Sequence, residues 1–129
     1  MRRSSSWRAF KPGRARAAVP GAGAVAAAAH AVRILGLDPG SRATGFGVVD
    51  LGRDGPRYVA CGAIRATGED FPKRLQAIYA GVAALIAAYG PGEIAIERVF
   101  VNRNPDSALK LGQARGAALS ATFGSRAPI

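Results

Sequence analysis

The stretch Val32–Ser41 constrains the fold of this chain more than any other part of the sequence. It reads Val-Arg-Ile-Leu-Gly-Leu-Asp-Pro-Gly-Ser, an apolar run that ends in a turn. Side chains alternate along a strand, so Ile34, Gly36 and Asp38 share one face. Pro39 and Gly40 turn the chain, and the two glycines leave open space beside Asp38. We therefore expect a strand with one carboxylate at its end, open to a phosphate or a metal ion.

Two further apolar runs predict an antiparallel meander. Thr44–Leu51 follows the first turn directly, and Arg57–Ile64 follows a second turn at Gly52–Pro56. Because Cys61 is the single cysteine, no internal disulfide can form, and the sequence suggests no cysteine-based metal site. We expect Cys61 to be a small buried hydrophobe in the third strand.

A helix and a fourth strand are predicted next. Asp70 suits an N-cap, large apolar residues recur at helical spacing up to Tyr89, and a Gly-Pro pair follows. Ile94–Ile96 then suits a strand buried on both faces. A strand reached through a helix normally lies parallel to its neighbour by a right-handed crossover. It can therefore bring Glu97 to the same end of the sheet as Asp38.

A second helix begins at Asn104-Pro105-Asp106, which combines a cap residue, a first-turn proline and an acid on the helix dipole. It is expected to run over about Ser107–Ala121. Its small residues fall four apart and form one ridge: Ala108, Gly112, Gly116 and Ser120. Two mid-helix glycines cost about 1 kcal/mol each relative to alanine, which indicates close approach of another helix. That helix can belong to this chain or to a second copy.

Residues 1–31 differ in composition from the rest of the chain. They carry six Arg or Lys and no acid, whereas residues 32–129 have a net charge of +4. The segment is similar to a transit peptide and, more loosely, to a secretory signal. We prefer a disordered extension or a start site assigned too far upstream, because the segment lacks periodic large apolar residues. No stretch is apolar enough to cross a bilayer, and the basic body favours a polyanionic partner.

The candidate chemistry centres on Asp38 and Glu97. Two carboxylates at neighbouring strand ends suit Mg²⁺ or Mn²⁺, and two such ions can drive phosphodiester hydrolysis. The alternatives are that Asp38 caps its turn and that Glu97 pairs with a surface cation. Phe100 lies among basic residues, as in surfaces that stack on bases; packing at the domain edge is the alternative. The candidate phosphate-binding cations, each of which can equally be a solvated residue, are Lys73, Arg74, Arg98, Arg103, Lys110 and Arg115.

Four motifs together resemble the RuvC family of bacterial Holliday junction resolvases. They begin at Ile34 (ILGLDPGSRATGFGV), Arg74 (RLQAIYAG), Ala95 (AIERVF) and Asn104 (NPDSALKLGQARG). The resemblance covers about residues 32 to 119. It implies a ribonuclease H-like α/β fold, a cytoplasmic homodimer and Mg²⁺-dependent cutting of four-way DNA junctions in recombination and repair, alongside a branch-migration helicase complex.

By the same resemblance, Asp38 and Glu97 match catalytic, metal-binding acids of the family. Phe100 matches an aromatic residue that enters the junction, and the helix from Pro105 matches one used in the dimer. The family has further active-site acids on a C-terminal helix, yet no acid follows Asp106 here. We therefore expect an incomplete nuclease domain over 32–123, an aberrant tail over 124–129, an unprotected sheet edge and half of a metal site. If the truncation is real, we expect the chain to be inactive.

Two other functions stay open. The Asp-Pro-Gly-Ser turn with its glycine-rich return also resembles the phosphate-binding hairpin of actin-like ATPases and sugar kinases, although a second phosphate loop is missing. The other alternative is a non-catalytic remnant that binds junctions or dimerises. ATP binding would support the former, and junction binding without metal-dependent cleavage the latter.

Overall fold

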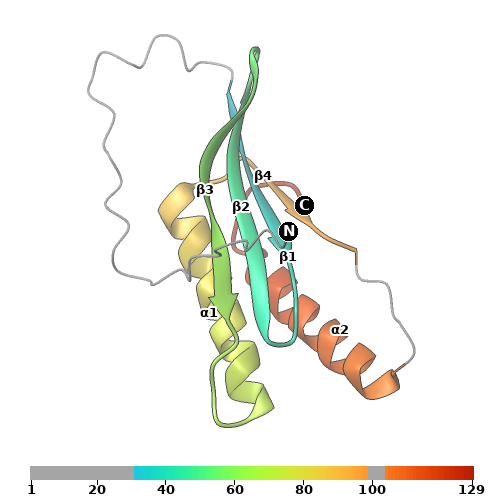
Figure 1. Ribbon diagram of the computed structural model, residues 1–129. Coiled ribbons are helices and arrows are strands. Elements are labelled where there is room, and N and C mark those ends of the chain that lie inside the picture. The colour runs from blue at the N-terminus through green and yellow to red at the C-terminus, as the bar shows by residue number, and fades with distance from the viewer. Residues whose placement is uncertain (1–30, 99–103) are drawn as a thin grey trace.

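A computed structural model describes residues 31–98 and 104–129, which form a four-stranded mixed sheet with two helices (Figure 1). The spatial strand order is β3-β2-β1-β4. In chain order the elements are β1 (Val32–Asp38), β2 (Ala43–Gly52), β3 (Gly55–Arg65), α1 (Phe71–Tyr89), β4 (Glu93–Ile96) and α2 (Pro105–Ser120). The predicted order of strands and helices is confirmed, and β1 has its predicted bounds.

The register of β1 determines which side chains share a face of the sheet. Asp38 lies opposite Gly45 in the antiparallel pair with β2, and Leu37 lies opposite Ile96 in the parallel pair with β4. Leu35 and Leu37 are buried in the core. Gly36, which lies between them, and Asp38 face the other side of the sheet, which we call the open face. The open face carries half-buried or exposed residues: Gly36, Asp38, Gly45, Gly47, Cys61, Ala63 and Ala95.

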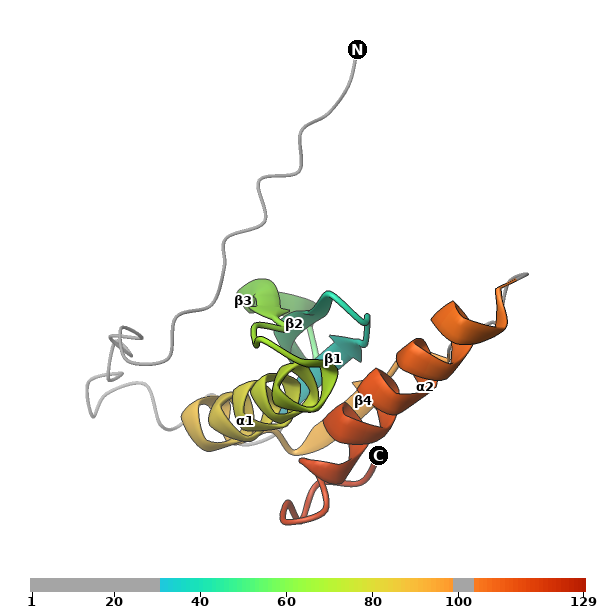
Figure 2. The same cartoon turned by 90° about the horizontal axis from the view of Figure 1, so that it is seen from below.

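Helix α1 packs on the side of the sheet opposite the open face (Figure 2). The Asp70 carboxylate accepts the Lys73 N–H at 2.8 Å, and Gly90 ends the helix at φ +54°, as predicted. At Gly81 a Cβ atom would lie 2.5 Å from Cγ2 of Ile64. Glycine therefore lets α1 approach β3 closely. The large side chains that α1 buries are Ile78, Val82 and Leu85.

Helix α2 packs against α1 through alanines. Its N-cap, Asn104, accepts the backbone N–H of Asp106 at 3.0 Å through its side-chain oxygen. Ala114 and Ala118, in the C-terminal half, are fully buried. The N-terminal half of the helix extends away from the sheet (Figure 1).

The small-residue ridge of α2 does not contact another helix of the described chain. Gly112, Gly116 and Ser120 are exposed, and Ala108 is half-buried. A Cβ atom at either glycine would meet nothing within 4 Å. The in-chain explanation of the ridge is therefore wrong, because α1 packs on the alanine side of α2 instead.

Two burial predictions are also wrong, for one physical reason. Ala95 is exposed although Ile94 is buried, so β4 is covered on one side. Cys61 is exposed as well, with its Sγ 3.9 Å from the Tyr58 hydroxyl. Both residues lie on the open face, which α1 does not cover. The pattern of apolar residues alone could not show which side of the sheet a helix would take.

The C-terminal residues lie beside β4. The Ile94 N–H donates to the carbonyl oxygen of Pro128 at 2.9 Å, and Ile94 is 4 % exposed. This contact protects part of the edge that we expected to be free. That 124–129 is an aberrant tail stays a prediction.

Two buried threonines differ in their hydrogen bonding, which gives a stability prediction. Thr44 Oγ1 is buried without a hydrogen-bond partner in the described structure, whereas Thr122 Oγ1 donates to the Leu119 carbonyl at 2.6 Å. Thr44→Val should raise the free energy of unfolding by about 1 kcal/mol, because it removes an unsatisfied buried hydroxyl. The matched Thr122→Val should lower it. Urea unfolding of both variants checks this, and a loss of stability in Thr44→Val would contradict it.

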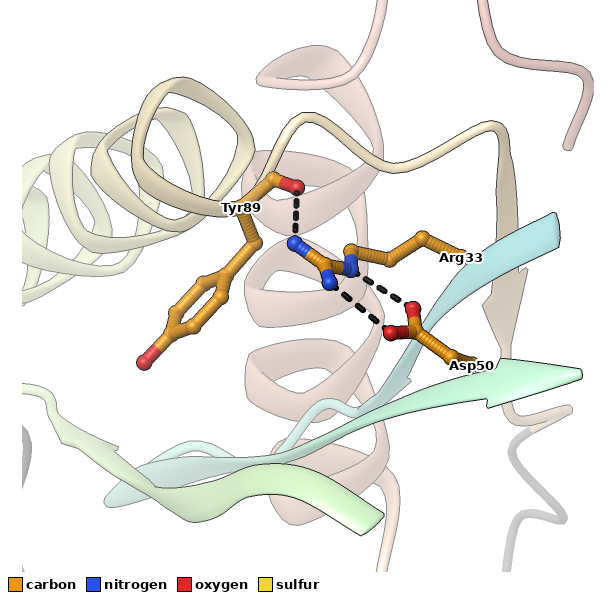
Figure 3. A network of polar contacts seen from close by, with 3 residues as sticks. All are labelled: Arg33, Asp50 and Tyr89. Atoms are coloured by element: carbon orange, nitrogen blue, oxygen red, sulfur yellow. Dashed lines mark hydrogen bonds and ion pairs between the residues drawn. The ribbon is translucent and has the colours of Figure 1, made fainter. Parts of the chain in front are cut away.

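An ion pair ties the other end of the sheet to α1. The Arg33 guanidinium donates to both carboxylate oxygens of Asp50, at 2.7 and 2.9 Å, and to the Tyr89 carbonyl at 3.2 Å (Figure 3). The hydrogen bond from Arg33 is the largest cause that lowers the pKa of Asp50. The same bond raises the pKa of Arg33. This network joins β1, β2 and the C-terminal end of α1.

The ion pair predicts acid-sensitive stability. An unfolded aspartate has a pKa near 3.9, and the pKa of folded Asp50 is lower. The stabilisation is therefore complete above about pH 3.9 and is lost as pH falls through the folded pKa. Asp50→Asn should cost about 1 kcal/mol at pH 7, since the pair is partly exposed, and the difference should vanish in acid. Thermal melts across pH measure this; an unchanged difference below pH 3 would contradict it.

Candidate metal centre

Asp38 and Glu97 lie at neighbouring strand ends on the open face. Asp38 is the last residue of β1, and Glu97 directly follows β4. The Glu97 N–H donates to the Leu37 carbonyl at 2.9 Å, which continues the parallel register past Ile96. Because paired residues share a face, both carboxylates leave the sheet on the same side. Both residues are exposed, and their predicted proximity is confirmed at the level of the backbone.

A glycine of β2 leaves the room beside Asp38. A Cβ atom at Gly45 would lie 3.6 Å from Asp38 Cβ and 3.9 Å from its Oδ2. Gly40, which we expected to provide this space, instead serves the turn, since a Cβ there would lie 2.5 Å from the Ala43 carbonyl oxygen. A Cβ atom at position 45 would therefore lie in ordinary van der Waals contact with the Asp38 side chain and fill the space beside it.

The two carboxylates fit a hard divalent cation in part. Neither side chain makes a hydrogen bond or ion pair within the described residues, so their oxygens are free to bind an ion. Mg²⁺ is commonly bound by one or two carboxylates together with waters and substrate phosphates. The described ranges contain no group of three or more acidic, histidine or cysteine side chains that could hold a metal. Among the described residues, the candidate site would therefore offer these two carboxylates as metal ligands.

Five of the six predicted DNA-binding cations are described. Two of them lie beside Glu97, and two lie at the start of α1. Arg98 is exposed beside Glu97, and the Arg115 Nε donates to the Glu97 carbonyl at 3.3 Å. Lys73 and Arg74 lie in the first turn of α1, where Lys73 pairs with Glu69 at 2.8 Å.

The remaining predicted contacts lie in or near α2. Lys110 pairs with Asp106 at 2.7 Å on the extended half of the helix. Phe100 and Arg103 lie outside the described residues. Arg42 and Arg65 are also exposed at this end of the sheet. The sequence did not predict them as DNA-binding residues. Nothing in their local sequence distinguishes them from solvated residues; only the strand register does.

A comparison with models of protein families shows which family this chain belongs to. The family model "Crossover junction endodeoxyribonuclease RuvC" matches residues 34–128. The chain belongs to the RuvC family. This membership favours the RuvC interpretation over the ATPase alternative, and the mixed sheet with its helices is the ribonuclease H-like fold expected of the family.

Individual RuvC proteins support the assignment. The RuvC crossover junction endodeoxyribonuclease of Hahella chejuensis is 59% identical over 90 residues, which cover 70% of this chain and 52% of that protein. That of Alkalilimnicola ehrlichii is 52% identical over 97 residues, covering 75% and 59%. The chain thus spans roughly half the length of these relatives.

A solved structure resembles the fold directly. The structure of T. thermophilus RuvC in complex with Holliday junction substrate matches with a TM-score of 0.68 and 30% sequence identity. The match covers 75% of this chain and 61% of that one. The described helices include none long and apolar enough for a membrane span.

Proposed function

We propose that this chain acts in the cleavage of four-way DNA junctions by metal-dependent phosphodiester hydrolysis. The observation that carries the proposal is the placement of Asp38 and Glu97 on one face, at adjacent strand ends, in a member of the RuvC family. Recombination and repair in the cytoplasm are the proposed setting. A Holliday junction is the substrate in the related T. thermophilus complex.

The proposed cofactor is Mg²⁺, with two ions in the complete site and Mn²⁺ as a substitute. Nucleases of this family are metal-dependent. Asp38 and Glu97 would hold the metal, which supplies a water nucleophile and stabilises the leaving oxygen when bound. Without a cation the two carboxylates repel each other and a DNA phosphate alike. A bound metal ion would offset this negative charge and allow a DNA phosphate to bind beside the two acids.

The proposed DNA surface surrounds these acids. Arg98 directly follows Glu97, and Arg115 donates to the Glu97 carbonyl. Phe100 and Arg103 follow shortly after Glu97 in the sequence. Lys73 and Lys110 are held by exposed ion pairs of a kind worth about 0.3–0.5 kcal/mol on helices, so both can exchange their carboxylate for a DNA phosphate. Together with Arg74 these cations supply sequence-independent affinity.

Homodimerisation through the small-residue ridge of α2 is part of the proposal, with a branch-migration helicase complex as a further partner. Gly116→Gln should weaken the dimer at least tenfold, because a long side chain prevents close approach of a second helix. It should leave the melting temperature of the monomer unchanged or higher, since position 116 is exposed and glycine is a poor helix former. Sedimentation equilibrium measures the first effect; a chain that is monomeric before substitution would contradict the ridge as an interface.

The direct test compares a labelled four-way junction with a linear duplex of the same sequence. The protein should bind the junction selectively and incise it only when Mg²⁺ or Mn²⁺ is present. Selective binding without incision under any metal would favour the non-catalytic remnant. Absence of both selective binding and incision would overturn the proposal.

A further inference from the structure

Arg65 lies on the same face of the sheet as the candidate metal centre. It is the last residue of β3 and pairs with Ala43, two residues beyond the pair of Ala63 with Gly45. Gly45 in turn lies opposite Asp38. Because alternate residues of a strand share a face, Arg65 lies on the open face, whereas its neighbour Ile64 is 5 % exposed in the core.

No helix or strand of the described residues covers the surface between Arg65 and the acids. Its residues have a minimal side chain or none: Gly36, Gly45, Gly47 and Ala63. All four are partly exposed. Two strand spacings and two residues separate Arg65 from Asp38, or roughly 12 Å between Cα atoms in ideal geometry. A DNA strand spans such a distance in a few nucleotides, and the length of the arginine side chain reduces the distance to be spanned.

The Arg65 guanidinium does not stabilise the fold through a polar contact with the described residues. The side chain is exposed and makes no hydrogen bond or ion pair with residues 31–98 or 104–129. By contrast, Arg33 at the other end of the sheet is held by a carboxylate and a carbonyl. An unpaired guanidinium beside an open floor is well placed for bidentate contact with a phosphate.

We propose that Arg65 binds a backbone phosphate of the DNA strand held at Asp38 and Glu97, a few nucleotides from the scissile phosphate. The inference rests on the proposed function and assigns one more contact to the same site. The open face then acts as the floor on which the cleaved strand lies. Arg65 supplies affinity and direction for that strand and no base specificity, because phosphate contacts carry no sequence information.

The test measures how tightly the full chain binds a four-way junction in Ca²⁺. Binding is detected by fluorescence anisotropy over a series of salt concentrations. Arg65→Gln should lower the slope of log affinity against log salt by about 0.9, the value for one lost phosphate contact, and weaken binding about tenfold near 50 mM salt. Arg65→Lys keeps the charge and should retain most of the slope. Arg53→Gln is the matched control, since Arg53 is also exposed but lies in the turn at the far end of β3.

The outcomes separate this inference from the proposed function. A reduced slope in Arg65→Gln supports the phosphate contact, provided that Arg53→Gln keeps the slope of the unsubstituted chain. An unchanged slope in Arg65→Gln, or an equal loss in Arg53→Gln, overturns it while junction binding itself stands. A chain that binds no junction DNA overturns the proposed function and the Arg65 contact together. Circular dichroism melts establish that each variant is folded.

Discussion

Asp38→Asn is expected to reduce Mg²⁺-dependent incision of a four-way junction by more than about 100-fold. Groups that merely orient a metal ligand cost about 10–100-fold in metal affinity or activity when removed, and Asp38 would bind the metal itself. Asparagine has the same shape, so the space beside Gly45 is unchanged. The substitution also removes a negative charge beside the bound phosphate. Junction affinity in the absence of metal should therefore stay the same or rise.

The matched control for this substitution is Asp54→Asn. Asp54 is exposed in the turn between β2 and β3, far from the strand ends that hold Asp38 and Glu97. It should leave incision and its metal dependence unchanged. Incision rates in a Mg²⁺ titration measure both variants. Equal rates in Asp38→Asn and Asp54→Asn would show that Asp38 is a turn residue and not a metal ligand.

Leu85→Ala is expected to lower the free energy of unfolding by about 3 kcal/mol. Leu85 is fully buried in α1 and belongs to the core between that helix and the sheet. Its truncation removes apolar contacts and leaves a cavity, and such changes cost about 2–5 kcal/mol. This is a large share of the stability of a small domain, commonly about 5–15 kcal/mol, so the variant should be partly unfolded at 37 °C.

Leu51→Ala makes the same chemical change at a site that is 44 % exposed. It should cost about 1 kcal/mol, well below the cost of Leu85→Ala, because nearly half of the Leu51 surface is already exposed to solvent. Urea unfolding followed by circular dichroism compares the two. Similar losses in both variants would mean that the helix and sheet do not share a packed core.

Much of the fold followed from local patterns in the sequence. The caps at Asp70 and Gly90 bounded α1 because each satisfies backbone groups that a helix leaves unpaired. The rule that a strand–helix–strand unit crosses over in one hand then placed β4 beside β1. That single step brought Glu97 next to Asp38, although 58 residues separate them in the chain.

What the sequence could not determine was which side of the sheet and of α2 would be covered. Cys61 and Ala95 have apolar neighbours, yet both lie on the open face because α1 packs on the other side. The ridge at Gly112 and Gly116 was equally compatible with a partner in this chain, and only the packing of Ala114 excluded that. Arg65 was missed for the same reason, since its relation to Asp38 depends on register across three strands.

Binding of Mn²⁺, followed by electron paramagnetic resonance, tests most directly whether Asp38 and Glu97 form one metal centre. The unsubstituted chain should bind Mn²⁺, and Asp38→Asn and Glu97→Gln should each weaken binding at least tenfold. The double variant should be little weaker than either single one if both residues hold the same ion. Affinity that is unchanged in both single variants would contradict a shared centre at the ends of β1 and β4.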